Sequence, residues 1–332
     1  MGTDGYDMKA LTFNGADLLL NEIPLPDRRP GDVLIQVHYA GICNTDHEIL
    51  RGYMPGFTGV PGHEFVGWIR EADNDRLVGS RATAEINIGC ESDSCAWCIS
   101  GMQRHCPNRA VLGIQGRDGV MAQYVAVPER NVVPIPDSIP DNQAIFIEPL
   151  AAACEILEQI SVGKEQTVLV LGDGKLAQLI ARVLGTHAGR DQVVVCGKHS
   201  AKKALFPRDL VTVVDLETCT SDSTRFDIVV EATGSPSGLD MAVTKVRPRG
   251  CVVLKSTCAA SAGFNPAPLV VNEITCVGSR CGRFAEALDF LVSTGLDLSP
   301  LITAIRPLVQ GREAFALSTQ PDVMKVVLDC SG

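Results

Sequence analysis

Residues 167–177 read Thr-Val-Leu-Val-Leu-Gly-Asp-Gly-Lys-Leu-Ala, an apolar run followed by a glycine-rich turn. The run 167–171 has the length and composition of a buried strand, and a helical pattern follows the turn to about residue 184. Gly172, Gly174 and Ala177 form the pattern G-x-G-x-x-A between them. In this setting the pattern predicts a dinucleotide site, because Gly172 permits the tight turn, Gly174 lets the backbone approach a pyrophosphate, and Ala177 lets helix and strand pack closely.

Working outward, strands and helices alternate on both sides of this turn. A helix is expected at 151–160, and short strands are expected at 193–196, 211–214, 227–231 and 251–254. Such alternation predicts an α/β domain with a doubly wound parallel sheet, the Rossmann arrangement. Before residue 150 the chain instead reads as short strands broken by Gly and Pro, with an irregular insert near 85–110. A helix at 283–293 and a strand at 324–328 are expected in the tail.

The cofactor type is predicted from the end of the second strand of this sheet. Lys175 and Leu176 open the helix whose free N–H groups favour phosphate. An NAD site usually has Asp or Glu after the second strand, but here Gly197, Lys198 and His199 follow Cys196. A missing carboxylate beside cations suits a 2′-phosphate, so the sequence favours NADP over NAD. The alternative is that these are solvated loop residues.

The chain has 13 cysteines and begins without the basic and apolar regions of a signal peptide. We therefore expect reduced thiols and metal ligands in a cytoplasmic protein. Four cysteines, separated by four, two and seven residues, predict a structural zinc site: Cys90, Cys95, Cys98 and Cys106. The alternative is a set of unligated thiols. Seven isolated cysteines are expected to be small buried hydrophobes: Cys154, Cys196, Cys219, Cys251, Cys258, Cys276 and Cys330.

Cys43 and His63 are two further candidate metal ligands. Cys43 stands in GICNTD just after an expected strand, and His63 stands in PGHE just before one. A catalytic zinc takes three protein ligands and keeps one position open, so Cys, His and a carboxylate would suit it. A single His is more often a polar residue with an ordinary hydrogen-bond partner, and the residues alone leave this choice open.

Composition limits the partners. The net charge is −10 with scattered acidic residues, and no basic face for a nucleic acid is visible. The sequence has no run of 18 apolar residues, the length that a membrane-spanning helix needs. We expect a small-molecule substrate, with neither a nucleic acid nor a membrane as partner.

Together these motifs resemble the medium-chain dehydrogenase/reductase superfamily, in its zinc-containing alcohol, polyol and threonine dehydrogenase-like branch. The resemblance spans the chain: GICNTD and PGHEFVG resemble the segments of the catalytic zinc, the cysteine-rich loop resembles the structural-zinc lobe, and VLGDGKLA resembles the cofactor loop. It implies a GroES-like β-rich catalytic domain at 1–150, a Rossmann domain at 151–283, and a segment 284–332 that returns to the catalytic domain. Relatives are usually dimers or tetramers, which implies a homodimer or homotetramer.

The resemblance also implies roles for individual residues. The catalytic zinc ligands would be Cys43, His63 and Glu148, the last from the segment Ile147-Glu148-Pro149-Leu150. Glu64 would be adjacent and able to exchange into the ligand set. The hydroxyl of Thr45 would take the proton from the substrate, and Asp46 would be the acceptor that orients His63. His47 or Glu48 would relay the proton to solvent, and many relatives have a histidine at the position of Glu48.

The expected function is therefore zinc-dependent alcohol dehydrogenase or carbonyl reductase activity, with hydride moving between NAD(P) and a small alcohol, polyol or sugar. Two alternatives differ in class. One is a zinc-free enone or quinone reductase on the same scaffold, and metal analysis would distinguish it. The other is a non-catalytic nucleotide-binding protein, which turnover assays would distinguish.

Overall fold

A computed structural model describes residues 7–257 and 263–332. The chain divides into two compact units: Met1–Glu148 with Phe284–Gly332, and Pro149–Arg283. The segment 284–332 thus belongs to the same unit as the N-terminal half. The predicted class, a β-rich domain with a Rossmann-type parallel sheet, is confirmed.

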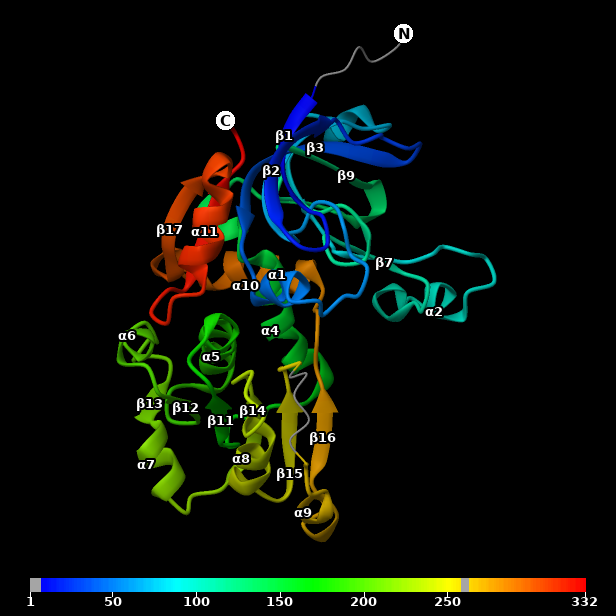
Figure 1. Ribbon diagram of the computed structural model, residues 1–332. Helices are drawn as coiled ribbons and strands as arrows, with labels where there is room; N and C mark the ends of the chain where they lie inside the picture. The colour runs from blue at the N-terminus through cyan, green and yellow to red at the C-terminus, as the bar shows by residue number, and fades with distance from the viewer. Residues whose placement is uncertain (1–6, 258–262) are drawn as a thin grey trace. The chain divides into compact units, whose positions relative to one another are not determined.

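The first unit is built mainly on antiparallel strands (Figure 1). Its largest sheet has the order β10-β5-β4-β3-β18-β17, with β9 also pairing with β3. The bounds of these strands are β3 Asp32–Gly41, β4 Glu64–Glu71, β5 Arg81–Ala84, β9 Tyr124–Pro128, β10 Val132–Pro134, β17 Ile302–Pro307 and β18 Lys325–Asp329. A two-stranded sheet and a three-stranded sheet complete the strands: β1 Asp7–Phe13, β2 Leu18–Pro24, β6 Asn87–Ile88, β7 Ala110–Leu112 and β8 Gly116–Arg117.

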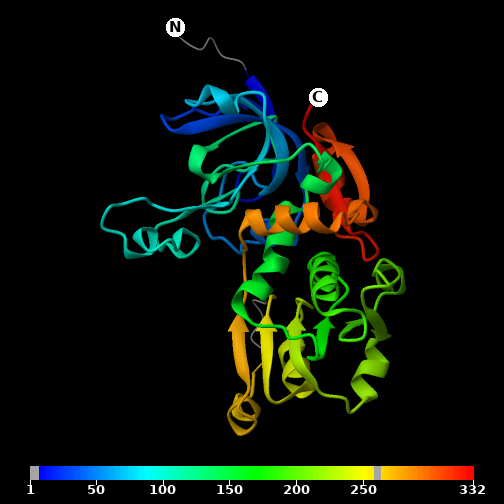
Figure 2. The same cartoon turned by 180° about the vertical axis from the view of Figure 1, so that it is seen from behind.

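Short helices connect the strands of the first unit. They are α1 Asn44–Leu50, α2 Ala96–Ile99, α3 Asp141–Ala144, α10 Phe284–Thr294 and α11 Gly311–Ser318, with 3₁₀ turns at Asp75–Leu77, Gln103–His105, Glu129–Asn131, Ser299–Leu301 and Leu308–Gln310. The loop that carries α2 projects from the sheets of this unit in both ribbon views (Figures 1 and 2).

The second unit is a six-stranded sheet with the order β13-β12-β11-β14-β15-β16, and every pair in it is parallel. Its strands are β11 Val168–Leu171, β12 Val193–Gly197, β13 Thr212–Asp215, β14 Phe226–Glu231, β15 Val246–Leu254 and β16 Thr275–Gly278. Its helices are α4 Ile147–Gln159, which enters the unit at Pro149, and α5 Lys175–Ala188, α6 Ser200–Lys203, α7 Leu216–Ser221, α8 Gly238–Lys245 and α9 Ala267–Val271. This strand order places the first βα turn at the crevice where dinucleotides bind in such sheets.

The central strand of the second unit is covered on both faces of the sheet. Leu169 and Leu171 face a core that α7 and α8 complete with Cys219 and Ala242. Every position of β11 is buried, as expected for a central strand of a parallel sheet with helices on both faces. Within the described residues, no helix combines the length and apolar character needed to span a bilayer.

Two local expectations need correction. The helix predicted at 151–160 is α4, Ile147–Gln159, so Glu148 lies in its first turn. Pro149 does not prevent this earlier start, because proline is tolerated in a first turn, where its missing N–H would have no helical partner. Among the seven isolated cysteines, Cys276 is exposed because β16 is an edge strand, and Cys251 is half-buried. Cys258 lies outside the described residues, and the other four are buried as expected.

Candidate metal centres and cofactor site

Cys43, His63 and Glu64 converge in the first unit. Cys43 follows β3 and is the N-cap of α1, His63 immediately precedes β4, and Glu64 begins β4. The sulfur, a ring nitrogen and a carboxylate oxygen of these residues lie within 4.8 Å of one another. These are three ligand types that zinc accepts, so the donor set fits a zinc ion.

The pairing of β3 with β4 explains part of this convergence. Gly41, the last residue of β3, is the register partner of Glu64. A Cβ atom at position 41 would collide with the Glu64 carboxylate. The glycine of GICNTD therefore leaves the space that the buried Glu64 side chain occupies.

Asp46 organises both Cys43 and His63. One carboxylate oxygen, Oδ2, accepts the Cys43 backbone N–H at 2.8 Å. The other, Oδ1, lies 3.4 Å from His63 Nδ1, and within the described residues neither of these two buried atoms has a hydrogen-bond partner. Burial alone would lower the pKa of His63, but Asp46 raises that pKa well above its ordinary value. The second-sphere role of Asp46 toward His63 stays a prediction.

Lys325 is a site residue that the motifs did not indicate. It begins β18, and its ammonium is bonded to the Glu64 carboxylate, with both side chains buried. Burial alone would lower the pKa of Lys325, but Glu64, Cys43 and Glu148 together raise it. Lysine is almost never fully buried unless it is paired with an opposite charge. The one sequence signal for such a pair was the position of Lys325 at the start of an apolar strand.

Glu148, the predicted third ligand, is placed differently from Glu64. Its charge acts on Lys325, so it lies in the same neighbourhood. Among the described residues, however, the compact ligand group contains Glu64 rather than Glu148. The assignment of Glu148 as a zinc ligand stays a prediction.

The three residues predicted to move protons all lie on α1. Thr45 Oγ1 is 3.7 Å from Cys43 Sγ. His47 Nε2 is 2.7 Å from the hydroxyl of Ser318, which itself donates to the Phe315 carbonyl oxygen. Glu48 is exposed, and its carboxylate is 2.8 Å from the Arg51 guanidinium.

The four clustered cysteines come together in the projecting loop around α2. The sulfur atoms of Cys90, Cys95, Cys98 and Cys106 lie within 4.8 Å of one another. The Cys90–Cys98 and Cys95–Cys106 sulfur separations are 3.9 and 3.8 Å. A tetrahedron with zinc–sulfur bonds of about 2.3 Å has edges of about 3.8 Å, so the arrangement fits a four-thiolate zinc.

The glycine-rich turn of the second unit uses glycine where the backbone conformation and the approach of a ligand call for it. Gly172 has φ +122°, and a Cβ there would approach the Ala232 carbonyl oxygen to 2.6 Å. Gly174 caps α5, and a Cβ there would meet open space, so ligand can approach. Lys175 and Leu176 form the first turn of α5, and Ala177 is fully buried where helix and strand meet.

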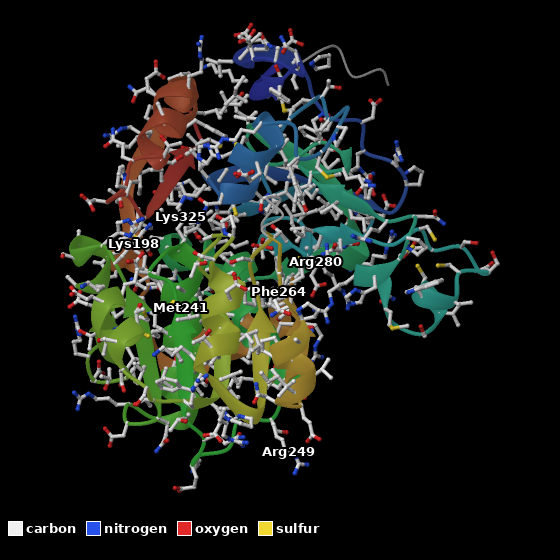
Figure 3. All side chains as sticks on the ribbon, turned by 60° about the horizontal axis from the view of Figure 1, so that its bottom comes forward. Lys198, Met241, Arg249, Phe264, Arg280 and Lys325 are labelled. Carbon is white, nitrogen blue, oxygen red and sulfur yellow. The ribbon has the colours of Figure 1, made fainter. Side chains whose placement is uncertain are left out.

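The end of β12 has the residues that the sequence predicted and one further carboxylate beside them. Gly197 ends the strand, and Lys198 and His199 follow as an exposed and a half-buried residue. Figure 3 labels Lys198 here and Arg249 toward the opposite end of the same sheet. The Asp173 carboxylate reaches this position from the glycine-rich turn and accepts the backbone N–H groups of both loop residues. The Asp173 carboxylate therefore lies at the end of β12, a placement that the sequence pattern did not indicate, and the NADP preference stays a prediction.

Comparisons with known proteins agree with this architecture. Residues 29–137 match the alcohol dehydrogenase GroES-like domain, and residues 177–293 match the zinc-binding dehydrogenase family. An L-threonine 3-dehydrogenase of Xanthomonas campestris is 29% identical over 97% of this chain and 99% of its own length. A sorbitol dehydrogenase of Halalkalibacterium halodurans is 28% identical with the same coverage. A crystal structure of an Escherichia coli alcohol dehydrogenase with NADH superposes with a TM-score of 0.88 at 26% identity, covering 97% of this chain and 99% of that one.

Proposed function

Because this chain belongs to the zinc-containing alcohol dehydrogenases of the medium-chain superfamily, we propose that it oxidises a small alcohol, polyol or sugar, and reduces the corresponding carbonyl, with a nicotinamide cofactor. The observation that carries the proposal is the convergence of Cys43, His63 and Glu64 in one unit, while the other unit presents the dinucleotide turn at Gly172–Ala177.

Bound zinc would supply Lewis acidity toward the substrate oxygen, and the bound nicotinamide ring would supply or accept hydride. Cys43 and His63 would hold the zinc, and Glu64 or Glu148 would provide the carboxylate. Asp46 accepts the backbone N–H of Cys43 through Oδ2, and its Oδ1 would orient His63 from 3.4 Å away. Lys325 holds Glu64 in place and balances part of the negative charge of this ligand set.

The proton would leave the substrate through Thr45, whose hydroxyl lies close to Cys43. Of the two predicted relay residues, His47 is the better supported. Its ring is positioned by Ser318 and by an edge contact with Phe315, whereas Glu48 is exposed and engaged by Arg51.

The substrate class rests on the relatives rather than on geometry. Two of them are named for threonine and sorbitol, molecules whose hydroxyl groups stand next to other polar groups. This favours polyols, sugar alcohols and amino alcohols over simple long-chain alcohols. The cytoplasmic location and the homodimer or homotetramer remain predictions.

The deciding experiment measures metal content and turnover on the same purified sample. We expect about two zinc ions per chain, one for each ligand group, and nicotinamide-dependent oxidation of at least one member of a polyol, sugar and amino-alcohol panel. Cys43→Ser is expected to abolish turnover and lower the zinc content by about one ion. Zinc near zero in an active wild-type enzyme would instead support the zinc-free reductase, and cofactor binding without any turnover would support the non-catalytic alternative.

A further inference from the structure

The carboxylate of Asp173, a residue of the glycine-rich turn, lies beside the end of β12. A Cβ atom placed on Gly197 would lie 2.9 Å from Asp173 Cβ and 3.0 Å from Asp173 Oδ2. The Asp173 carboxylate therefore stands where the side chain of a strand-end aspartate would begin. In an NAD site that aspartate accepts the 2′-hydroxyl of the adenosine ribose.

This carboxylate is held firmly in place. Its Oδ2 accepts the N–H of Lys198 at 2.8 Å and of His199 at 2.7 Å, and its Oδ1 lies 2.9 Å from His199 Nδ1. Burial alone would raise the pKa of Asp173, but the hydrogen bonds from His199 and Lys198 lower it overall. Asp173 is thus ionised at neutral pH, and two backbone N–H groups near the ribose position are already used by it.

The loop that follows β12 is also fixed from its far side. The Gln178 amide donates to the Lys202 carbonyl oxygen at 2.8 Å. The Arg182 guanidinium donates to the Leu205 carbonyl oxygen at 2.8 Å and to Gln178, and both side chains are buried. Side chains of the glycine-rich turn and of α5 therefore hold the loop at both ends. It cannot withdraw from Asp173 to admit a larger ligand without breaking these bonds.

The cationic partner of this carboxylate, when protonated, is His199, whose Nδ1 lies 2.9 Å from Oδ1. The two nearby lysines do not neutralise it. Lys203 is paired with Asp215, and the Lys198 side chain is exposed to solvent. An exposed charge is screened by water and salt, whereas Asp173 is only 6% exposed. A 2′-phosphate dianion at this position would meet a fixed negative charge, while a 2′-hydroxyl would meet an acceptor.

We propose that Asp173, acting from the glycine-rich turn in place of a strand-end carboxylate, makes the adenosine-ribose site select NAD over NADP. This inference rests on the proposed nicotinamide-dependent function, and it replaces the NADP preference predicted from Gly197, Lys198 and His199. Gly197 belongs to the same arrangement, because a Cβ atom there would lie 2.9 Å from both Asp173 Cβ and Lys203 Cγ.

The test is fluorescence titration of NADH and NADPH against the purified full-length protein. We expect wild type to bind NADH at least about tenfold more tightly than NADPH, the scale of one close charge–charge contact. Asp173→Asn is expected to reduce that ratio by about tenfold. Asp209→Asn, which removes an exposed charge from the same unit, is expected to leave the ratio unchanged.

A rescue variant separates selectivity from a merely structural role. In the double variant D173G/G197D the glycine in the turn removes the Cβ atom that a Cβ at position 197 would meet at 2.9 Å, and the flexible Lys203 side chain, whose Cγ lies equally close, has to turn aside. The aspartate then stands on the strand itself, and the NADH preference is expected to return. Tighter binding of NADPH by wild type, an unchanged ratio in Asp173→Asn, or failure of the double variant to restore the NADH preference would overturn the inference while leaving the dehydrogenase function intact. Binding of neither nucleotide would contradict the proposed function itself, and the inference with it.

Discussion

At the scale of single residues, the buried ion pair of Lys325 and Glu64 holds one carboxylate of the candidate metal centre in place. Both side chains are buried, so Lys325→Met would leave an uncompensated carboxylate beside Cys43. Breaking a buried pair in this way costs about 3–5 kcal/mol. We expect a loss of that order in the free energy of urea unfolding. A double-mutant cycle with Glu64→Gln provides the control, because the two losses should be clearly less than additive. Additive losses would show that the pair is not coupled.

His47 and Glu48, neighbours on α1, are the two candidates for the proton relay, and their surroundings differ. Because His47 is positioned by Ser318 and Glu48 is engaged by Arg51 at the surface, His47→Asn should lower kcat by about 10²-fold or more, the lower end of the range for general acid–base catalysis. Glu48→Gln is the matched control and should change kcat by less than about twofold. Steady-state rates at saturating substrate measure both. A larger effect of the Glu48 variant would reassign the relay.

At the scale of elements, the loop around α2 depends on its four sulfur atoms. Only Cys106 among them is buried, while Trp97, Ile99 and Met102 are exposed, so the loop has little apolar core of its own. We expect Cys98→Ser to lower the zinc content by about one ion per chain and to make the loop a site of rapid proteolytic cleavage. Cys276→Ser, at an exposed cysteine outside both ligand groups, should change neither property. Unchanged zinc content in Cys98→Ser would contradict a four-thiolate site.

Asp227 joins three strands of the parallel sheet. One oxygen accepts the backbone N–H and hydroxyl of Thr167, which precedes β11, and the other accepts from Arg247 in β15. Burial alone would raise the pKa of Asp227, but the bonds from Arg247 and Thr167 lower it overall. Asp227→Asn should therefore cost about 1–2 kcal/mol near neutral pH.

The sign of the pH dependence follows from that lowered pKa. Stabilisation by Asp227 is fully present above the pKa of the unfolded state and is lost as the pH falls through the folded value. In urea unfolding, the difference between wild type and Asp227→Asn should be constant above about pH 5 and shrink below about pH 4. A difference that grows on acidification would contradict the lowered pKa. Asp191→Asn, at an exposed position, controls for loss of a surface charge.

At the scale of the whole molecule, the sequence indicated residues that the structure brings together wherever those residues belong to a local pattern. The turn at Gly172–Ala177, the cysteine cluster and the Cys43 and His63 segments are all local patterns. Sequence reasoning failed where a side chain acts across the fold. Lys325 reaches Glu64 only because β18 pairs with β3, and β3 pairs with β4. Asp173 was overlooked because its effect depends on the neighbouring strand rather than on its place in the motif.

Both ligand groups lie in the first unit and the dinucleotide turn lies in the second, which predicts that metal and cofactor binding are separable. Protein stripped with pyridine-2,6-dicarboxylate and then gel-filtered should lose turnover, because the metal centre has lost its Lewis acid. Its NADH dissociation constant should stay within about twofold of the untreated value, since the strand, turn and helix that bind dinucleotide contain no metal ligand. Returning zinc should restore turnover, and a mock treatment without chelator provides the control. A tenfold or greater loss of NADH affinity on stripping would instead show that the metal centre supports the nucleotide-binding unit, and the division of labour between the two units would have to be abandoned.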